Sequence, residues 1–153
     1  MELTIEQALQ QGVTAHKEGK LQDAERFYRA VLQSQPLHPD ANHNLGVLAV
    51  SVNKADAALP LFKTALEANP KIEQFWLSYI DALIKEKQLN NAKQALEQAG
   101  KFGLVGDKID NLESQLKQIT QFALPNPPKE TKSRSLEKKR RKLPVQKKKA
   151  KKQ

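Results

Sequence analysis

The feature that most constrains this fold is a recurring spacing of 34 residues between chemically similar positions. The spacing relates Gly12 to Gly46, Pro36 to Pro70, Ala24 to Ala58 and Ala92, Leu21 to Ala55 and Leu89, and Tyr28 to Phe62 and Leu96. Self-similarity at a period of roughly 20 to 50 residues is typical of stacked arrays, whose units bury their apolar faces against each other. The spacing therefore predicts a repeat array rather than one globular core.

Each unit has the pattern of two helices. In residues 39–72, apolar side chains recur at helical spacing before and after a short break at Asn53 and Lys54. The second helix is expected to end at Asn69, because a residue that precedes proline is driven out of the α region. Pro60 is expected near the first turn of this helix, where its missing N–H has little effect.

Small residues occupy the positions where helices are expected to cross. Helices of about a dozen residues are marginal alone and must bury a face against neighbours. Gly12 and Gly46 allow backbones to approach closely, and Tyr28 and Phe62 are expected to fill the space between layers. Aromatic residues make up only 5% of the chain, and Ala, Leu, Gln, Lys and Glu dominate, which favours an all-α fold.

The pattern of Gly, Ala, aromatic and Pro at period 34 resembles the tetratricopeptide repeat. The resemblance implies an α-solenoid of three helix-turn-helix units within residues 1–106, at about 5–38, 39–72 and 73–104. Four positions depart from the pattern: Ala8 and Asn42 replace a bulky residue, Ile80 replaces the third Gly, and Leu104 replaces the third Pro. Terminal units of such arrays are commonly atypical.

A further amphipathic segment follows the third unit. Residues 107–122 begin with Asp107, a suitable N-cap, and carry an apolar stripe at Ile109, Leu112, Leu116 and Ile119. We expect a capping helix that covers the last repeat. A partner-binding amphipathic helix is the alternative.

The basic charge of the chain is concentrated at its C-terminal end. Residues 1–122 carry 13 Lys/Arg and 15 Asp/Glu, whereas residues 123–153 carry 13 Lys/Arg and 2 Asp/Glu. Prolines and like charges make residues 123–153 an expected disordered tail or linker. A contact with RNA, the ribosome or acidic lipid is a second hypothesis, carried by Lys138, Lys139, Arg140, Arg141, Lys142, Lys147, Lys148 and Lys149. No aromatic residue follows Phe122, so base stacking by the tail is not expected. Targeting is a third hypothesis, because residues 138–142 resemble a nuclear import signal.

No catalytic constellation is evident. The histidines, His16, His38 and His43, fall at different repeat positions without a cysteine in the chain, so we expect exposed histidines and no metal site. Ser34, Ser51 and Ser78 have no paired histidine in any evident register. We therefore expect neither an enzyme nor a cofactor.

The family resemblance implies that the first helix of each unit lines a concave groove for a peptide or partner domain. Carried over to this sequence, the groove consists of Leu9, Val13, His16, Lys17, His43, Asn44, Val47, Val50, Leu77, Asp81, Ile84 and Lys85. The side-chain amide of Asn44 could hold a peptide backbone. Of the cationic clamp that some relatives use for acidic chaperone termini, only Asn44 is present. Leu9, Val13, Gln74 and Ser78 occupy the other clamp positions, so this ligand type is not expected.

These observations predict a non-catalytic protein–protein interaction scaffold. Two alternatives come from other classes. The chain could be the recognition module of a larger bacterial transferase, glycosyltransferase-like or sulfotransferase-like, or an RNA- or ribosome-associated adaptor that acts through its tail. The absence of cysteine, of a secretion signal and of a membrane span leads us to expect a cytoplasmic protein. We also expect a monomer.

Overall fold

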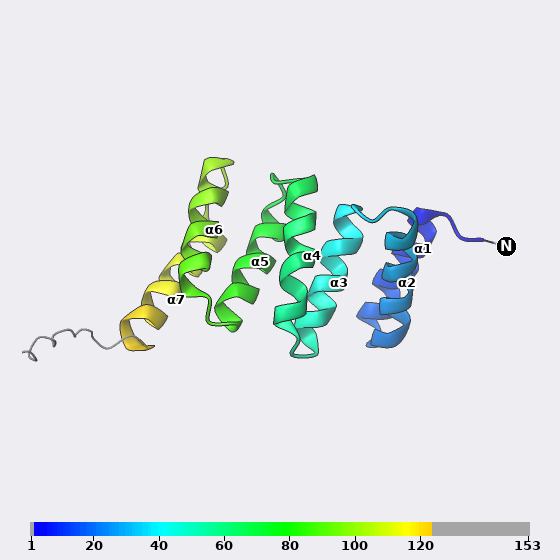
Figure 1. Cartoon of the computed structure of the whole chain (residues 1–153), viewed down its shortest axis with the longest axis horizontal. Coiled ribbons are helices and arrows are strands. Elements are labelled where there is room, and N and C mark those ends of the chain that lie inside the picture. The colour runs from blue at the N-terminus through cyan, green and yellow to red at the C-terminus, as the bar shows by residue number, and fades with distance from the viewer. Residues whose placement is uncertain (1, 124–153) are drawn as a thin grey trace, which may run out of the picture. The chain divides into compact units, whose positions relative to one another are not determined.

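The computed structural model describes residues 2–123, which form seven α-helices and no strand (Figure 1). The helices are α1 (Ile5–Lys17), α2 (Leu21–Ser34), α3 (Pro39–Ser51), α4 (Ala55–Ala68), α5 (Glu73–Lys85), α6 (Leu89–Lys101) and α7 (Asp107–Ala123). The first six form three pairs, with α1, α3 and α5 as first helices and α2, α4 and α6 as second helices. The predicted all-α repeat fold is confirmed.

The turn inside each pair repeats in its backbone conformation. Gly19, Asn53 and Lys87 have φ angles of 79°, 63° and 59°, in the left-handed region. The residue after each of them donates its backbone N–H to a carbonyl five residues earlier, at 2.8 Å in all three turns. The break predicted from sequence is therefore the same helix-ending motif three times over.

The connections between successive pairs share one feature, a side-chain hydrogen bond to the carbonyl of a proline. Trp76 Nε1 donates a hydrogen bond to the backbone oxygen of Pro70 at 2.7 Å. One repeat earlier, Asn42 Nδ2 donates to the oxygen of Pro36 at 3.0 Å and to that of His38 at 2.9 Å. Asn42 is buried, and it bonds to the carbonyl of Pro36, which is one repeat before the Pro70 carbonyl that the indole satisfies. The substitution of Asn for a bulky residue therefore preserves this connection.

The small residues lie where the helices of a pair cross, as predicted. A Cβ added at Gly12 would lie 2.7 Å from Tyr28 Cε1, and one added at Gly46 would overlap the ring of Phe62. Real Cβ atoms do not approach neighbours so closely, so both positions require glycine. In the third pair the equivalent position is Ile80, which is fully buried.

Pro60 lies deeper in its helix than the sequence suggested. It is the sixth residue of α4, past the first turn, so that expectation is wrong. Its missing N–H removes the usual helical donor to the carbonyl of Asp56, four residues earlier. The carbonyl of Pro60 itself accepts from Thr64 Oγ1 at 3.0 Å.

Successive pairs stack mainly through the second helix of one pair and the first helix of the next, since α2 packs on α3 and α4 packs on α5. Within residues 2–116, which form one compact unit, α1 contacts α3 and α3 contacts α5, whereas α2, α4 and α6 do not pack directly on one another. We call the side of α1, α3 and α5 the inner face, and the side of α2, α4 and α6 the outer face. Ile109 and Leu116 of α7 are buried. The expectation that this helix caps the last repeat stays a prediction.

Candidate functional site

The predicted groove residues all lie on the first helices. Lys17 and Lys85 are exposed, and eight others are half-buried: Leu9, Val13, His16, Asn44, Val47, Val50, Leu77 and Asp81. His43 and Ile84 are different, because each is only 8% exposed. These two side chains pack in the interior behind the inner face, and little of their surface is accessible to a ligand.

His43 connects two repeats across the inner face. Its Nε2 lies 2.8 Å from Ser78 Oγ, and its Nδ1 lies 3.3 Å from Asn44 Oδ1. The ring packs against Phe62 and Phe75, with centroid separations of 5.5 and 4.8 Å. The expectations that histidines are exposed and that Ser78 has no paired histidine are therefore wrong for this pair.

The environment of His43 favours a neutral ring. Burial lowers its pKa below the ordinary value of 6.5, and this effect outweighs the hydrogen bond to Asn44 and the charge of Asp40, which both raise the pKa. With Nδ1–H donating to Asn44, Nε2 can accept the Ser78 hydroxyl, and Gln74 Nε2 donates to the same Oγ at 3.2 Å. The result is a fixed polar bridge between α3 and α5.

The helix that carries Ser78 does not supply one requirement of an acyl-transfer site. Such a site needs free donors aimed at the developing oxyanion. Ser78 lies in the interior of α5, where the backbone N–H groups serve the helix. The contact between His43 and Ser78 therefore fixes the inner face where α3 meets α5. The backbone of α5 around Ser78 offers no free N–H groups to an oxyanion.

The remaining histidines also have structural partners. His16 Nδ1 lies 3.2 Å from the Tyr28 hydroxyl, and His38 caps α3 by accepting from the N–H of Ala41 at 3.2 Å. Residues 2–123 hold no cluster of three or more His, Cys, Asp or Glu suited to a metal ion. None of the helices described there is long and apolar enough to cross a membrane.

The charges on the inner face are partly paired. Lys85 Nζ lies 2.8 Å from Asp81 Oδ2, one turn away on α5. Lys17 has no ion-pair partner among the residues that the structure describes. Exposed pairs of this kind contribute under about 1 kcal/mol to stability. We therefore consider the apolar side chains, and not this ion pair, as the main feature of the inner face.

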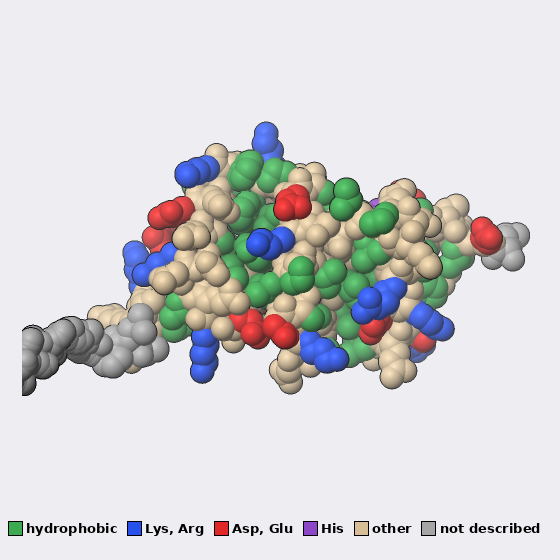
Figure 2. Space-filling model, in the orientation of Figure 1, with side chains coloured by type: hydrophobic (Ala, Val, Ile, Leu, Met, Phe, Trp, Pro, Cys, Tyr) green, Lys and Arg blue, Asp and Glu red, His purple; other side chains and the backbone are tan. Residues whose placement is uncertain are grey.

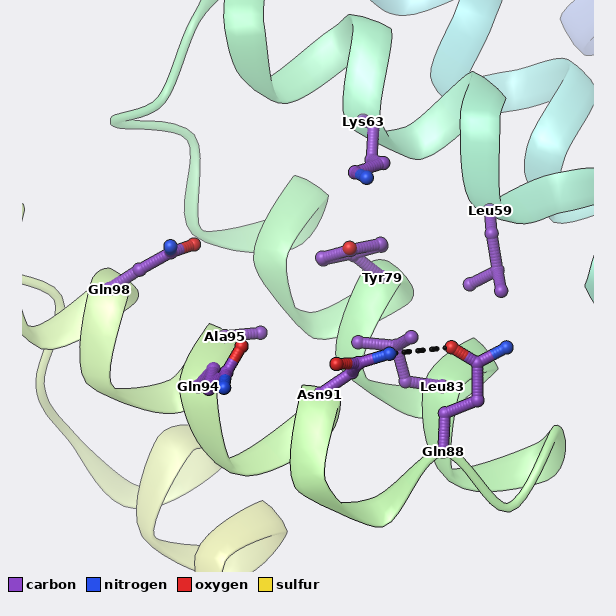
Figure 3. Close-up of a pocket in the computed structure, with 9 residues that line it drawn as sticks. All are labelled: Leu59, Lys63, Tyr79, Leu83, Gln88, Asn91, Gln94, Ala95 and Gln98. Carbon is purple, nitrogen blue, oxygen red and sulfur yellow. Dashed lines mark hydrogen bonds between the residues drawn. The ribbon is translucent and has the colours of Figure 1, made fainter.

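A second surface, which the sequence did not predict, lies on the outer face between α4 and α6. Figure 2 shows hydrophobic side chains gathered between these two helices. Two adjoining cavities share Lys63, Tyr79 and Gln98. In Figure 3, side chains of α4 and α6 face each other across Tyr79 and Leu83 of α5. We call this surface the outer groove.

The outer groove has a sequence signal, which is a run of amides on one side of α6. Gln88, Asn91, Gln94 and Gln98 recur at spacings of three, three and four residues. Such a run is easily taken for an ordinary solvated helix face, since its chemistry appears only when α4 is placed opposite.

The proposed polyanion-contact residues, at 138–142 and 147–149, lie outside the described residues. The same holds for nearly all of the predicted tail, 123–153. Those hypotheses stay predictions from sequence.

Comparisons with known proteins agree with the repeat period. Two family models described as "Tetratricopeptide repeat" match residues 9–71 and 49–115. A search of curated protein sequences found no match.

Solved structures of similar fold include three tetratricopeptide-repeat domains. The TPR2B domain of yeast Sti1, in a complex with pHsp70, has a TM-score of 0.68 at 18% identity, covering 74% of this chain and 96% of that one. The Sgt2 TPR domain from Aspergillus fumigatus has a TM-score of 0.67 at 17% identity, covering 80% and 85%. The first TPR of Spaghetti (RPAP3), bound to the HSP90 peptide SRMEEVD, has a TM-score of 0.66 at 18% identity, covering 72% and 88%. With the 34-residue period, the paired helices and the two matching models, the chain belongs to the tetratricopeptide-repeat family.

Proposed function

We propose that this protein is a non-catalytic interaction scaffold that binds a peptide or partner domain on its inner face. The observation that carries the proposal is a row of half-buried aliphatic side chains across three adjacent first helices, namely Leu9, Val13, Val47, Val50 and Leu77. Aliphatic side chains that keep part of their surface in water can bury it against a ligand.

The polar bridge beneath this row supports the proposal. Because His43 and Ser78 join α3 to α5, the aliphatic side chains of the second and third repeats are held in fixed relative positions. A surface that is ordered before binding loses less conformational entropy when a ligand arrives. Asn44, beside them, adds an amide that can donate to and accept from a peptide backbone.

The structural neighbours favour a peptide ligand but not the same peptide. Two of the similar domains are complexes with an HSP90 peptide and with pHsp70. Here the clamp positions for an acidic terminus hold Leu9, Val13, Gln74 and Ser78, which carry no positive charge. The proposed ligand is therefore a segment that presents aliphatic side chains. The transferase-module and RNA-adaptor alternatives rest on sequence alone.

The test is selection of binders from a displayed random-peptide library on the full chain, at roughly 0.3 M salt to screen the basic tail. Selected peptides are then titrated against Leu77→Ala and Leu59→Ala. Both remove a half-buried leucine, but Leu77 lies at an inner-face position and Leu59 lines the outer groove.

We expect Leu77→Ala to weaken binding about tenfold, which corresponds to roughly 1.4 kcal/mol, and Leu59→Ala to leave it within about twofold. Circular dichroism of both variants is the control, and we expect both to remain helical. Equal losses in the two variants, or a loss with Leu59→Ala alone, would contradict the inner-face assignment.

A further inference from the structure

We infer that the outer groove is a second binding site, which takes an extended acidic segment of a partner protein independently of the inner face. The two cavities that form it have volumes of about 270 and 560 Å³. Because both are lined by Lys63, Tyr79 and Gln98, the two cavities adjoin along α6, and together we call them the channel.

The length of the channel defines the size of its ligand. Lining residues run from Gln88, before α6, to Phe102, after it. At 1.5 Å per helical residue this is about 21 Å. An extended chain rises about 3.3 Å per residue, so the channel accommodates about six residues.

The α6 side of the channel offers amides suited to a peptide backbone. Gln94 and Gln98 have no side-chain hydrogen-bond partner among the described residues. Asn91 Nδ2 donates to Gln88 Oε1 at 2.8 Å, which leaves the Gln88 amide N–H groups and the Asn91 oxygen free (Figure 3). Primary amides both donate and accept, as peptide groups do. A row of them matches a ligand whose backbone is extended and unpaired.

The charges on the channel favour acidic side chains. Lys63 lines both cavities and Lys101 lines the wider one, and neither forms an ion pair within residues 2–123. One carboxylate, Glu67, also lines the wider cavity. Two positive charges against one negative charge give the lining a net positive charge. The folded region as a whole is acidic, so this surface is suited to an acidic ligand.

The wider cavity adds an apolar end to the channel. Trp76 and Phe102 lie with ring centroids 6.0 Å apart, next to Leu66 and Pro70. The indole N–H already donates to the Pro70 oxygen, so this end offers mainly apolar surface. One bulky apolar side chain of the ligand fits here, between acidic neighbours that reach the lysines. The chain's own tail, with 13 Lys/Arg and 2 Asp/Glu, has the wrong charge for this site.

The test uses the full chain and a fluorescein-labelled peptide of seven residues, with a central phenylalanine flanked by three glutamates on each side. Its counterpart has glutamine in place of glutamate. Fluorescence anisotropy is recorded at roughly 0.3 M salt, so that the tail contributes little. The variants are Lys63→Glu in the channel and Lys93→Glu, an equal charge reversal at an exposed residue of α6 that does not line it.

We expect the acidic peptide to bind, with Lys63→Glu weakening it about tenfold and Lys93→Glu changing it less than about twofold. The glutamine peptide should bind more weakly. Gln94→Ala with Gln98→Ala provides a second, milder variant that should also weaken binding. Equal losses from Lys63→Glu and Lys93→Glu, equal binding of both peptides, or no binding would overturn the inference. A peptide selected on the inner face should bind Lys63→Glu normally, which separates this result from the proposed function.

Discussion

The second and third repeats fill the crossing between their two helices in different ways. At this crossing the second has no side chain on its first helix and a large ring on its second, whereas the third has an aliphatic side chain on each. In the second, Gly46 lies against the ring of Phe62 so closely that no Cβ could fit. In the third, the same two positions hold Ile80, which is fully buried, and Leu96, which is half-buried. Both repeats therefore fill the space at the helix crossing, and glycine is needed only where its partner on the second helix is a large ring.

The largest effect is expected from emptying the crossing of the third repeat. Ile80→Gly removes a fully buried side chain and places glycine inside a helix. We expect a loss of about 4 kcal/mol in the free energy of unfolding. Adding Leu96→Phe should restore part of it, because the pair then matches the second repeat. Thermal unfolding followed by circular dichroism measures both, and a double variant no more stable than the single one would contradict the volume argument.

The converse change overfills the second repeat. Gly46→Ile adds a branched side chain where Phe62 Cδ1 would lie only 2.8 Å from a new Cβ. We expect destabilisation of about 3 kcal/mol, at the upper end for overpacking. Combining it with Phe62→Leu should recover about half of the loss, a coupling that a double-mutant cycle isolates. Additive losses would show that the two positions do not share one space.

The same two repeats meet at His43, and this contact should depend on pH. Burial lowers the pKa of His43 in the folded state, so the unfolded chain takes up this proton first as the pH falls below about 6.5. The contribution of the neutral ring to stability is therefore present above that value and lost as the pH falls through the folded-state pKa. Urea unfolding at several pH values should show this loss. His43→Gln should remove this part of the pH dependence, and an unchanged profile would contradict the assignment.

The smallest effect concerns the turns that the repeats share. Gly19, Asn53 and Lys87 adopt the same left-handed conformation, but only glycine does so without steric strain. Lys87→Gly should raise the free energy of unfolding by roughly 0.5–1 kcal/mol, and Asn53→Gly by less, since asparagine tolerates this region. Chemical denaturation of both variants provides the measurement. A destabilised Lys87→Gly variant would mean that the lysine makes a contact worth more than the strain.

Sequence patterns predicted the parts of the fold that repeat. Gly12 and Gly46, with their aromatic partners, carry the 34-residue period because the same crossing occurs twice. Asn42 appeared in the sequence only as a departure from the pattern, but its amide bonds to the Pro36 carbonyl, just as Trp76 bonds to the equivalent carbonyl of Pro70 one repeat later.

The contacts between repeats were not predictable in the same way. His43 and Ser78 are 35 residues apart and occur once, so no period identifies them, and their contact depends on how α3 packs on α5. The outer groove was missed for a related reason. Its amides lie on or just before α6, and Lys63 lies on α4. Only the three-dimensional arrangement of α4 and α6 shows that these residues line the same cavity.

The measurement that tests the account most directly is a map of backbone amide chemical shifts of the isotope-labelled full chain, titrated with a peptide selected from the random library. If the inner face binds the peptide, the shifted amides gather on α1, α3 and α5, around Leu9, Val47 and Leu77. Shifts confined to α2, α4 and α6, or a selection that yields no specific peptide, would contradict the inner face as the principal binding surface.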